Sequence, residues 1–496
     1  MSLEEFFSTP LITALSRHQT DSAEEAAITL FHSVAAKVPA YRDFLERQEI
    51  DPGRIQTFTD FQKLPLLTKQ NYMLAYPLPS LCRDGRLHDC EMIAVSSGST
   101  GKPLFWPRSL RHELDVAFRF EQIFRDAFQA HRRSTLVVIC FALGTWVGGI
   151  YTAACCRYLA QKGYPITLVT PGNNKNEIFR VIETLGPYFG QVVLAGYPPF
   201  IKEVIDFGRT QGIDWKRYAI KLILAGEVFS EEWRSLVCER VGSNDPVHDT
   251  ASLYGTADAG VLGNETPLSI AIRRFFAGHP DAAREQFGES RLPTLVQYDP
   301  LSRFFEVTPE GTLVVSGDNG VPLIRYHIAD KGGLIPYEAM LSFVKGHGGD
   351  PVAELRSGDL SKDQRGVYPL PFVYLFGRAD FTVSYYGANV YPENVTVGLE
   401  KEPIKHWVTG KFVLQVQETE TRDRLLSVVV ELLPGMTGNK EKSEAIAESI
   451  RRELVRLNSE FVNYVPSERQ LPEVILKTAG DPEYFPIGVK HRYTKK

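Results

Sequence analysis

The sequence is poor in the features that mark secreted, membrane-spanning and zinc-binding proteins. Its 496 residues include 6 cysteines with no Cys-x-x-Cys pair, a sparse use that is typical of a reducing compartment. No stretch approaches about 18 consecutive apolar residues, so we expect no transmembrane helix. The 11 histidines form no metal-spaced pair, and the first residues lack the long apolar run of a signal peptide. We therefore expect a cytoplasmic protein with no membrane partner.

An excess of basic charge is also missing. Lysine and arginine number 55 against 60 aspartates and glutamates, which gives a net charge of −5. We therefore expect neither a nucleic acid nor an anionic membrane surface as a partner. Hydrophobic residues make up 43% and charged residues 23%, as in ordinary soluble globular proteins. The length exceeds what one hydrophobic core normally serves, so two or more domains are expected.

What the chain does contain is a hydroxyl-rich and glycine-rich stretch at 94–103, Ala-Val-Ser-Ser-Gly-Ser-Thr-Gly-Lys-Pro. Its apolar flanks, Met92–Val95 and Pro103–Trp106, suit two strands of a hairpin. Glycine turns expose backbone N–H groups, which together with hydroxyls and a lysine suit a polyphosphate. A Walker A loop is excluded, because it needs glycine where the chain has Ser96 and serine or threonine where it has Pro103. A solvated linker is the alternative on composition alone.

The middle of the chain alternates short apolar segments with longer helical patterns. Strands are expected at 136–141, 165–169, 191–195 and 221–225, with helices at 111–132, up to 159, at 175–186 and at 198–209. This alternation favours a largely parallel α/β sheet, in which ligands bind beyond the carboxyl ends of the strands. Glycine-containing turns follow three of the expected strands, at 141–149, 195–197 and 225–227.

The two ends of the chain have sequence patterns that differ from this alternation. Residues 1–90 read as helical, and strands of a hairpin are expected at 304–307 and 312–316. The Gly- and Pro-rich interval 332–371 is interpreted as a loop-rich insertion. After Gly377-Arg378-Ala379-Asp380 the pattern suits a compact α+β unit, with strands at 412–416, 425–433 and 474–476 and a helix near 446–457. We therefore expect a large domain at 1–378 and a small α+β domain at 379–496.

Several motifs occur in the order found in the adenylate-forming superfamily. The loop at 96–103 resembles its phosphate-binding signature, and Ala225-Gly226-Glu227 resembles its Gly-Ala-Glu loop. Three further motifs are similar to Tyr-Gly-x-x-Glu, Arg-Tyr-x-x-x-Asp and Gly-Arg-x-Asp, and they lie at 254–258, 325–330 and 377–380. The segments 38–42, 64–69 and 141–149 resemble the phenylacetate–CoA ligase branch in particular. The resemblance implies an α/β fold: a large N-terminal adenylate-forming domain with mixed and parallel sheets and a β-rich subdomain, followed by a small mobile α+β domain.

The resemblance implies an AMP-forming acid–thiol ligase. A carboxylate would attack the α-phosphate of ATP to give an acyl-adenylate and pyrophosphate, and a thiol, usually that of CoA, would then take the acyl group. ATP, a carboxylic acid and CoA are the implied small-molecule partners, with Mg²⁺ as the metal. The bulk of Trp146 favours an aryl or short acid. Transfer to an amine or a carrier protein and an inactive nucleotide-binding regulatory homologue are open alternatives, and a homodimer is an open alternative to a monomer.

The resemblance also assigns roles to individual residues. It implies that the β- and γ-phosphates of ATP are bound by Ser96, Ser97, Gly98, Ser99, Thr100, Gly101 and Lys102. It implies that the rest of the nucleotide is bound by Gly226, Glu227, Tyr254, Gly255, Thr256, Asp330 and Arg378. Tyr254 would lie against the adenine, and Asp330 would bind the ribose hydroxyls. It implies that the pocket for the carboxylic acid is lined by Phe141, Leu143, Thr145, Trp146, Gly149 and Ala225. Asp380 would be the hinge between the domains.

Two assigned residues depart from the family pattern. Asp258 stands where the family usually has a glutamate at the magnesium position, so a closer backbone, a bridging water or Glu265 would have to compensate for the shorter side chain. Lys490 is the match for the adenylation lysine, although its spacing within Gly488-Val489-Lys490-His491-Arg492 is unusual. The other candidates for this lysine are Lys477, Lys495 and Lys496.

Overall fold

The computed structural model describes most of the chain. The described residues are 1–96, 104–144, 147–226, 228–289, 292–356, 366–378, 383–386, 388–418, 424–458, 461–462, 465–486, 491 and 493–494. Within these ranges, every helix is too short or too polar to cross a lipid bilayer.

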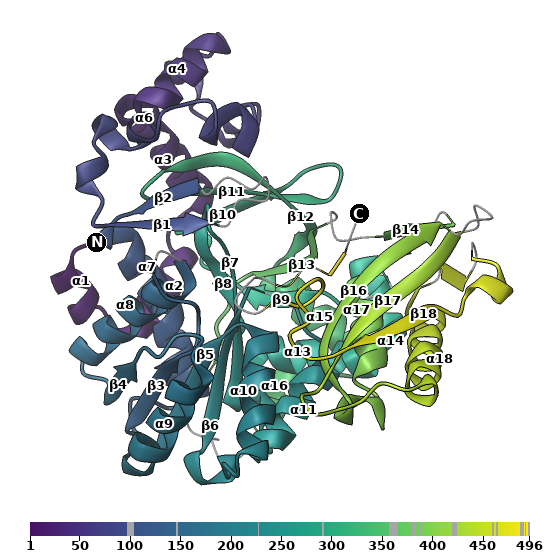
Figure 1. Ribbon diagram of the computed structural model, residues 1–496. Coiled ribbons are helices and arrows are strands. Elements are labelled where there is room, and N and C mark those ends of the chain that lie inside the picture. Colours follow the sequence, from purple (N-terminus) through teal and green to yellow (C-terminus); the bar gives the residue numbers. More distant parts are fainter. Residues whose placement is uncertain are drawn as a thin grey trace.

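The chain opens with a series of helices, and those from residue 23 onward stand at the top of the molecule (Figure 1). The series comprises α1 (Leu3–Ser8), α2 (Leu11–Ser16), α3 (Ala23–Lys37), α4 (Pro39–Arg47), α5 (Phe58–Phe61) and α6 (Leu78–Leu81). The hydroxyl of Ser22 caps the first turn of α3 by accepting from the Glu25 N–H. The buried face of α3, with Phe31 and Val34, packs into one core with the strands that carry Leu313 and Leu323. The expected helical opening is therefore confirmed.

A hairpin follows and leads into the main body. Strands β1 (Met92–Ser96) and β2 (Leu104–Arg108) are antiparallel, and Ser96 lies opposite Leu104. The expected strand–loop–strand arrangement of this region is confirmed for its two strands. The loop that the hairpin carries, residues 97–103, lies outside the described residues.

The central sheet has eleven strands in the order β10-β11-β12-β13-β9-β8-β7-β6-β5-β3-β4. Its parallel half contains β3 (Thr135–Ile139), β4 (Ile166–Val169), β5 (Gln191–Gly196), β6 (Ile220–Ala225) and β7 (Thr250–Thr256). Its antiparallel half contains β8 (Gly260–Asn264), β9 (Thr294–Gln297), β10 (Phe304–Val307), β11 (Thr312–Gly317), β12 (Leu323–Ile335) and β13 (Phe372–Arg378). The predicted α/β class with a mixed sheet is confirmed.

Helices cover both faces of the parallel half, which explains why its strands are apolar on both sides. Val137 and Val193 face a core shared with α7 (Leu110–Gln122) and α8 (Val147–Gln161). Their neighbours Leu136 and Val192 face the opposite core, shared with α9 (Lys175–Leu185), α10 (Pro198–Thr210) and α11 (Glu231–Val241). The side chains of each strand therefore alternate between two buried layers. Helices α12 (Pro246–Asp249), α13 (Pro267–Gly278) and α14 (Pro280–Phe287) follow along the chain.

The interpretation of 332–371 as a loop-rich insertion is wrong for much of that interval. Strand β12 continues to Ile335, and α15 (Tyr337–Gly346) and α16 (Pro351–Arg356) follow it. Met340 and Val344 lie one helical turn apart on α15 and are buried in a core with Phe276 of α13. Glycine and proline stand at the ends of these short helices, and their density hid the helical spacing of the apolar residues between them.

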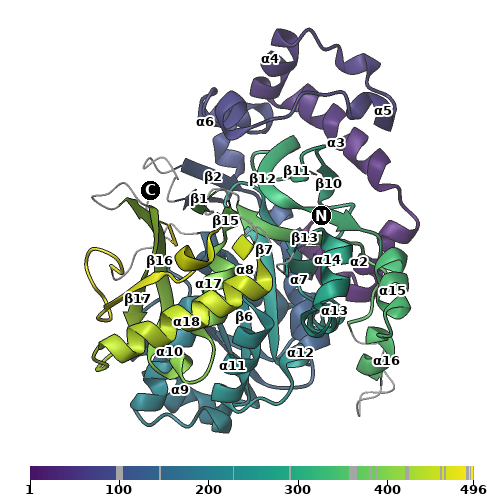
Figure 2. The same cartoon turned by 90° about the vertical axis from the view of Figure 1, so that its right-hand side faces the viewer.

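The C-terminal elements build sheets and a core of their own. Strands β14 (Val383–Tyr385) and β15 (Ala388–Val390) pair, and β16 (Val408–Glu418), β17 (Arg424–Leu432) and β18 (Glu473–Lys477) form a second sheet. Helices α17 (Pro392–Leu399) and α18 (Lys440–Leu457) pack together on it, with α18 in front in Figure 2. A Cβ at Gly398 would lie 2.8 Å from the Ile450 backbone, so the two helices approach closely there. The expected α+β texture is confirmed; the exact boundary and the hinge at Asp380 stay predictions.

Candidate active site

A cavity of about 1650 Å³ lies between the carboxyl ends of the parallel strands and the C-terminal elements from β14 onward. We call these C-terminal elements, which have a core of their own, the small domain and the preceding ones the large domain. On the large-domain side its wall includes residues that follow β3, β5 and β6, the end of β7, and parts of α8 and α10. On the small-domain side it is walled by β16, β17 and the segments 433–436 and 479–486, with His491 and Thr494. Ligands of open α/β sheets bind at this edge. The cavity is therefore the candidate site.

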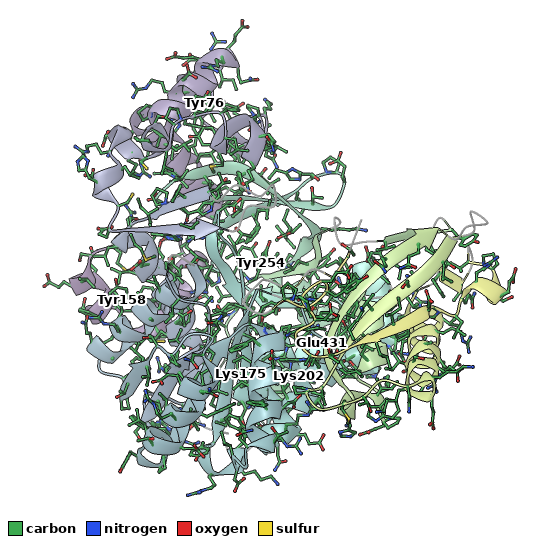
Figure 3. All side chains as sticks on the ribbon, viewed as in Figure 1. Tyr76, Tyr158, Lys175, Lys202, Tyr254 and Glu431 are labelled. Carbon is green, nitrogen blue, oxygen red and sulfur yellow. The ribbon has the colours of Figure 1, made fainter. Side chains whose placement is uncertain are left out.

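Two tyrosine–carboxylate pairs stand where β7 ends. The Tyr254 hydroxyl, on β7, donates to Asp330 Oδ2 on β12 at 2.7 Å, and both residues are about 6% exposed. The Tyr326 hydroxyl donates to Asp258 Oδ2. Figure 3 places Tyr254 near the centre of the molecule. Two carboxylates that are 72 residues apart in the sequence (330 − 258) thus each accept a hydrogen bond from a tyrosine hydroxyl.

Asp330 also lies opposite Arg378 in the backbone pairing of β12 with β13. The side chain of Arg378 lies outside the described residues, so only its backbone position is fixed. Three of the residues assigned to the nucleotide, Tyr254, Asp330 and Arg378, therefore share one region of the sheet. Gly226, Gly255 and Thr256 line the cavity beside them.

A buried arginine joins the hairpin to the turn after β7. Arg108, at the end of β2, is 1% exposed, and its guanidinium donates to the carbonyls of Ala257 and, at 3.4 Å, Asp258. Burial lowers the pKa of Arg108, although its ordinary value is so high that it stays charged. The base of the hairpin is thereby tied to the backbone that carries Asp258.

Arg325, from the same motif as Asp330, faces away from the cavity. Its Nε donates to Glu306 at 3.0 Å, and its Nη1 donates to the carbonyls of Gln62 and Leu64. Its φ of +47° is unusual for a residue with a side chain. The arginine of this motif therefore fastens the N-terminal helices to the sheet.

The residues assigned to the acid divide into two groups. Phe141 and Ala225 line the cavity. Gly149 lies behind the wall, where a Cβ would approach the Ala142 carbonyl oxygen to 2.6 Å, and Leu143 packs against Gly172. The described inner wall is largely apolar; it includes Phe120, Tyr151, Leu253 and Val261.

A neutral histidine supports this inner wall. His112 Nδ1 lies 3.0 Å from the Tyr151 hydroxyl, and the imidazole is fully buried. Burial drives the pKa of His112 well below its usual value, and the positive charges of Arg303 and Arg108 act in the same direction. His112 therefore stays uncharged at neutral pH and fixes the orientation of the Tyr151 ring. Neither residue is marked by a local motif, so the sequence did not predict them.

The small-domain wall carries ionisable groups that the sequence also did not predict. Lys411 Nζ lies 3.2 Å from Glu203 Oε2 and 3.5 Å from Glu431 Oε2, so it links α10 to the sheet of the small domain. Burial opposes ionisation of Glu203, but Lys411 and Lys175 together hold its pKa below the usual value. Burial lowers the pKa of His491 to about 4, against the effect of its 2.7 Å contact with the Phe412 carbonyl. Figure 3 shows Lys175 and Glu431 at this junction.

Several predicted site residues lie outside the described residues. They are Ser97, Gly98, Ser99, Thr100, Gly101, Lys102, Thr145, Trp146, Glu227, Asp380 and Lys490. Ser96 ends β1, and its side chain is likewise not described. The roles assigned to these residues stay predictions.

The assignment of Asp258 to a nucleotide-bound Mg²⁺ stays a prediction; one of its oxygens, Oδ2, accepts from the Tyr326 hydroxyl. In the part of the chain that the structure describes, histidine, cysteine and carboxylate side chains do not gather in threes of the kind that hold a metal ion alone. Magnesium on a nucleotide usually takes one or two protein carboxylates and completes its shell with phosphates and water. Glu265 is less suitable, because Arg234 (2.6 Å) and the Ser252 N–H (2.9 Å) occupy its two oxygens.

We predict that Gly260→Ala destabilises the protein at this site. Gly260 has φ of +73°, and a Cβ there would lie 2.6 Å from His112 Cε1. The backbone strain alone costs about 1–3 kcal/mol, and displacement of His112 adds to it. Thermal unfolding measures the effect. Gly278→Ala is the matched control, because a Cβ at Gly278 would meet open space. Equal unfolding temperatures for the two variants would contradict the prediction.

No protein-family model and no curated protein matches the sequence. Solved structures do match. A 2-hydroxyisobutyryl-CoA ligase in the postadenylation state, in complex with R3-HIB-AMP, aligns with a TM-score of 0.62 at 13% identity, over 96% of this chain and 87% of that chain. An open conformation of that ligase with 2-HIB-AMP and CoA gives 0.52 at 13% identity, over 96% and 90%. Its thioesterification state gives 0.51 at 13% identity, over 99% and 91%.

These alignments show that the chain has the fold of an acyl-CoA ligase over nearly its whole length. The score is higher for the postadenylation state than for the other two states of the same protein.

Proposed function

We propose that the protein activates a carboxylic acid with ATP and transfers the acyl group to a thiol, that of CoA. A carboxylate oxygen of the acid attacks the α-phosphorus of ATP, and the bond to pyrophosphate breaks. The thiol sulfur then attacks the acyl carbonyl, and AMP leaves with the former carboxylate oxygen. The observation that carries the proposal is the pairing of Tyr254 with Asp330 and of Tyr326 with Asp258 beside one large cavity, on a fold shared with a ligase of this kind.

The nucleotide would lie along the ends of β7 and β12. Asp330 would accept hydrogen bonds from both ribose hydroxyls, and Arg378 would assist from the backbone position opposite it. The glycine-rich loop at 96–102 would hold the β- and γ-phosphates, and Arg108 would keep the hairpin beside the turn at 257–258. Asp258 would hold the nucleotide's Mg²⁺, which offsets negative charge on the phosphates.

The acid would enter the inner part of the cavity. Phe120, Phe141 and Tyr151 supply three aromatic side chains to its wall, and Leu253 and Val261 supply aliphatic ones. Such a lining favours an uncharged body behind the carboxylate. An aryl or short aliphatic acid suits this lining, as expected for an enzyme similar to the phenylacetate–CoA ligases.

The proposal is tested by ATP–pyrophosphate exchange with a panel that contains benzoate, phenylacetate, propionate, butyrate and palmitate. We expect an aryl or short acid to support exchange and palmitate to support much less. CoA is then added, and the thioester and AMP are identified by mass. Absence of exchange with every acid contradicts the adenylation step and favours a nucleotide-binding homologue without activity. Exchange without a thioester contradicts CoA as acceptor and directs the search to amines and carrier proteins.

A further inference from the structure

Helix α10 presents a buried lysine to the small domain. Lys202 is 4% exposed, and its ammonium lies 3.0 Å from Asp206 Oδ2 on the same helix. The ammonium also donates to the carbonyl oxygens of Thr409 at 3.0 Å and Val408 at 3.5 Å, where β16 begins. Figure 3 shows Lys202 at the junction of the two domains. One cation of the large domain is thus bonded to the backbone of the small domain.

A second cation repeats this arrangement. Arg240, on α11, donates to Asp206 Oδ1 through Nη1 and to the Lys405 carbonyl oxygen at 3.2 Å through Nη2. Asp206 therefore holds two cations, and each of them reaches a backbone carbonyl of the small domain. We call Lys202, Asp206 and Arg240 the clamp.

The hydrogen bonding of the clamp is complete only when the domains are arranged as observed. A buried ammonium is costly unless its donors are satisfied and its charge is paired. Burial accordingly lowers the pKa of Lys202, while Asp206 opposes that shift. A rotation that carried β16 away from α10 would remove the two carbonyl acceptors of Lys202 and would leave water to replace them.

Side-chain contacts support the clamp at the same interface. Lys411 bridges to Glu203 on α10, and the Ser230 hydroxyl donates to Glu400 Oε2 at 2.6 Å. Lys411 and Glu203 also line the cavity, so the interface and the cavity wall are continuous. The arrangement that the clamp stabilises is the one in which the small domain completes the cavity wall.

We propose that Lys202 and Arg240 are positioning residues that stabilise the domain arrangement for acyl-adenylate formation and that must release the small domain before the thiol step. The proposal rests on the proposed function, and it uses the closer similarity of the chain to a postadenylation structure than to a thioesterification structure. In the described wall of the cavity, Asp206 contributes to the lining, whereas Lys202 and Arg240 do not. The clamp acts through the position of the small domain.

The test compares the two half-reactions in Lys202→Met. Arg240 still neutralises Asp206 in this variant, so no lone buried charge is left and the fold is expected to hold. Loss of charge-assisted hydrogen bonds should slow ATP–pyrophosphate exchange about tenfold or more. Thioester formation from synthetic acyl-adenylate and CoA, made with the best acid of the exchange panel, should be unchanged or faster. Asp206→Asn, which weakens the hold on both cations, should shift the two rates in the same directions.

Hydrogen exchange provides a readout that does not depend on activity. Without any ligand, the amides of 200–206 and 408–413 should exchange faster in Lys202→Met than in the wild type. Arg209→Gln is the matched control, since Arg209 lies on the same helix with an exposed side chain and should leave both rates and the exchange unchanged. If both half-reactions fall equally in Lys202→Met, or if its hydrogen exchange equals that of Arg209→Gln, the clamp is overturned. Faster hydrogen exchange in a protein that shows no adenylation would instead overturn the proposed function and leave the clamp as a domain contact.

Discussion

Replacing Lys490 with alanine is expected to lower ATP–pyrophosphate exchange by about a hundredfold or more. The resemblance places this ammonium between the carboxylate and the α-phosphate, where negative charge concentrates as the new bond forms. Removal of one such electrostatic donor typically costs two to three orders of magnitude, or about 2.7–4 kcal/mol. Thioester formation from supplied acyl-adenylate should change far less, because that step no longer involves the triphosphate. The two rates are measured separately on the purified variant.

Lys477→Ala is the matched control for Lys490→Ala. Lys477, on β18, lies 3.8 Å from Asp481 Oδ2, and its ammonium is 5.3 Å from the centre of the Tyr484 ring. Its charge therefore has partners inside the small domain, and we expect exchange near the wild-type rate. Lys495→Ala and Lys496→Ala complete the set. A wild-type rate of exchange in Lys490→Ala would contradict the assignment of Lys490 as the adenylation lysine. A loss of exchange in only one of the other three variants would assign that role to the lysine it replaces.

Replacing Asp330 with asparagine is expected to raise the KM for ATP by about a hundredfold. The carboxylate would accept two ribose hydroxyls, and charge-assisted hydrogen bonds contribute about 1.5–3 kcal/mol each. The amide keeps an oxygen that can accept from the Tyr254 hydroxyl, so the local packing should survive. The ATP dependence of exchange gives the KM, and thermal unfolding verifies the fold.

The use of 2′-deoxy-ATP separates ribose binding from support of Tyr254. The wild type should discriminate strongly against this analogue, and Asp330→Asn should lose most of that discrimination. Tyr254→Phe is the control, because it removes the 2.7 Å hydrogen bond and leaves both carboxylate oxygens of Asp330 in place; it should still discriminate. Equal discrimination by the wild type and Asp330→Asn would show that Asp330 does not read the ribose.

Local sequence patterns predicted β3, β4, β5 and β6 of the parallel half and the hairpin of β10 and β11, but not β7, β8, β9 or β13. Apolar segments such as 191–195 and 221–225 are short, continuous and separated by helical patterns, which is the signature of buried parallel strands. The antiparallel extension by β8, β9 and β13 depends on pairing between segments far apart in sequence, and Asn264 of β8 meets Gln297 of β9 across 33 positions (297 − 264). Such register carries no local signal. In 337–356 the density of glycine and proline outweighed the helical spacing of Met340 and Val344.

The candidate site likewise contains residues that local motifs predicted and residues that only the folded chain brings to the cavity. The motifs indicated Tyr254, Asp258 and Asp330 but not that tyrosine hydroxyls hold the two carboxylates, since that depends on how β12 passes the end of β7. Tyr326 stood inside a recognised motif without a role, and its neighbour Arg325 has a structural one. The small-domain wall was missed altogether. Lys411 and Glu431 are ordinary charged residues in their strands, and they reach the cavity only because the two domains meet there.

The clamp binds acceptors that every amino acid possesses. Lys202 and Arg240 are bonded to the carbonyl oxygens of residues 405, 408 and 409, and no side-chain substitution at those positions removes a carbonyl. We therefore expect the small-domain side of the interface to tolerate substitutions that the large-domain side does not. The small domain can change its side chains at these three positions and keep its acceptors, whereas the large domain loses a cationic donor when Lys202 or Arg240 becomes an apolar or acidic residue. Homologues that keep the interface should vary at 405, 408 and 409 more freely than at 202 and 240.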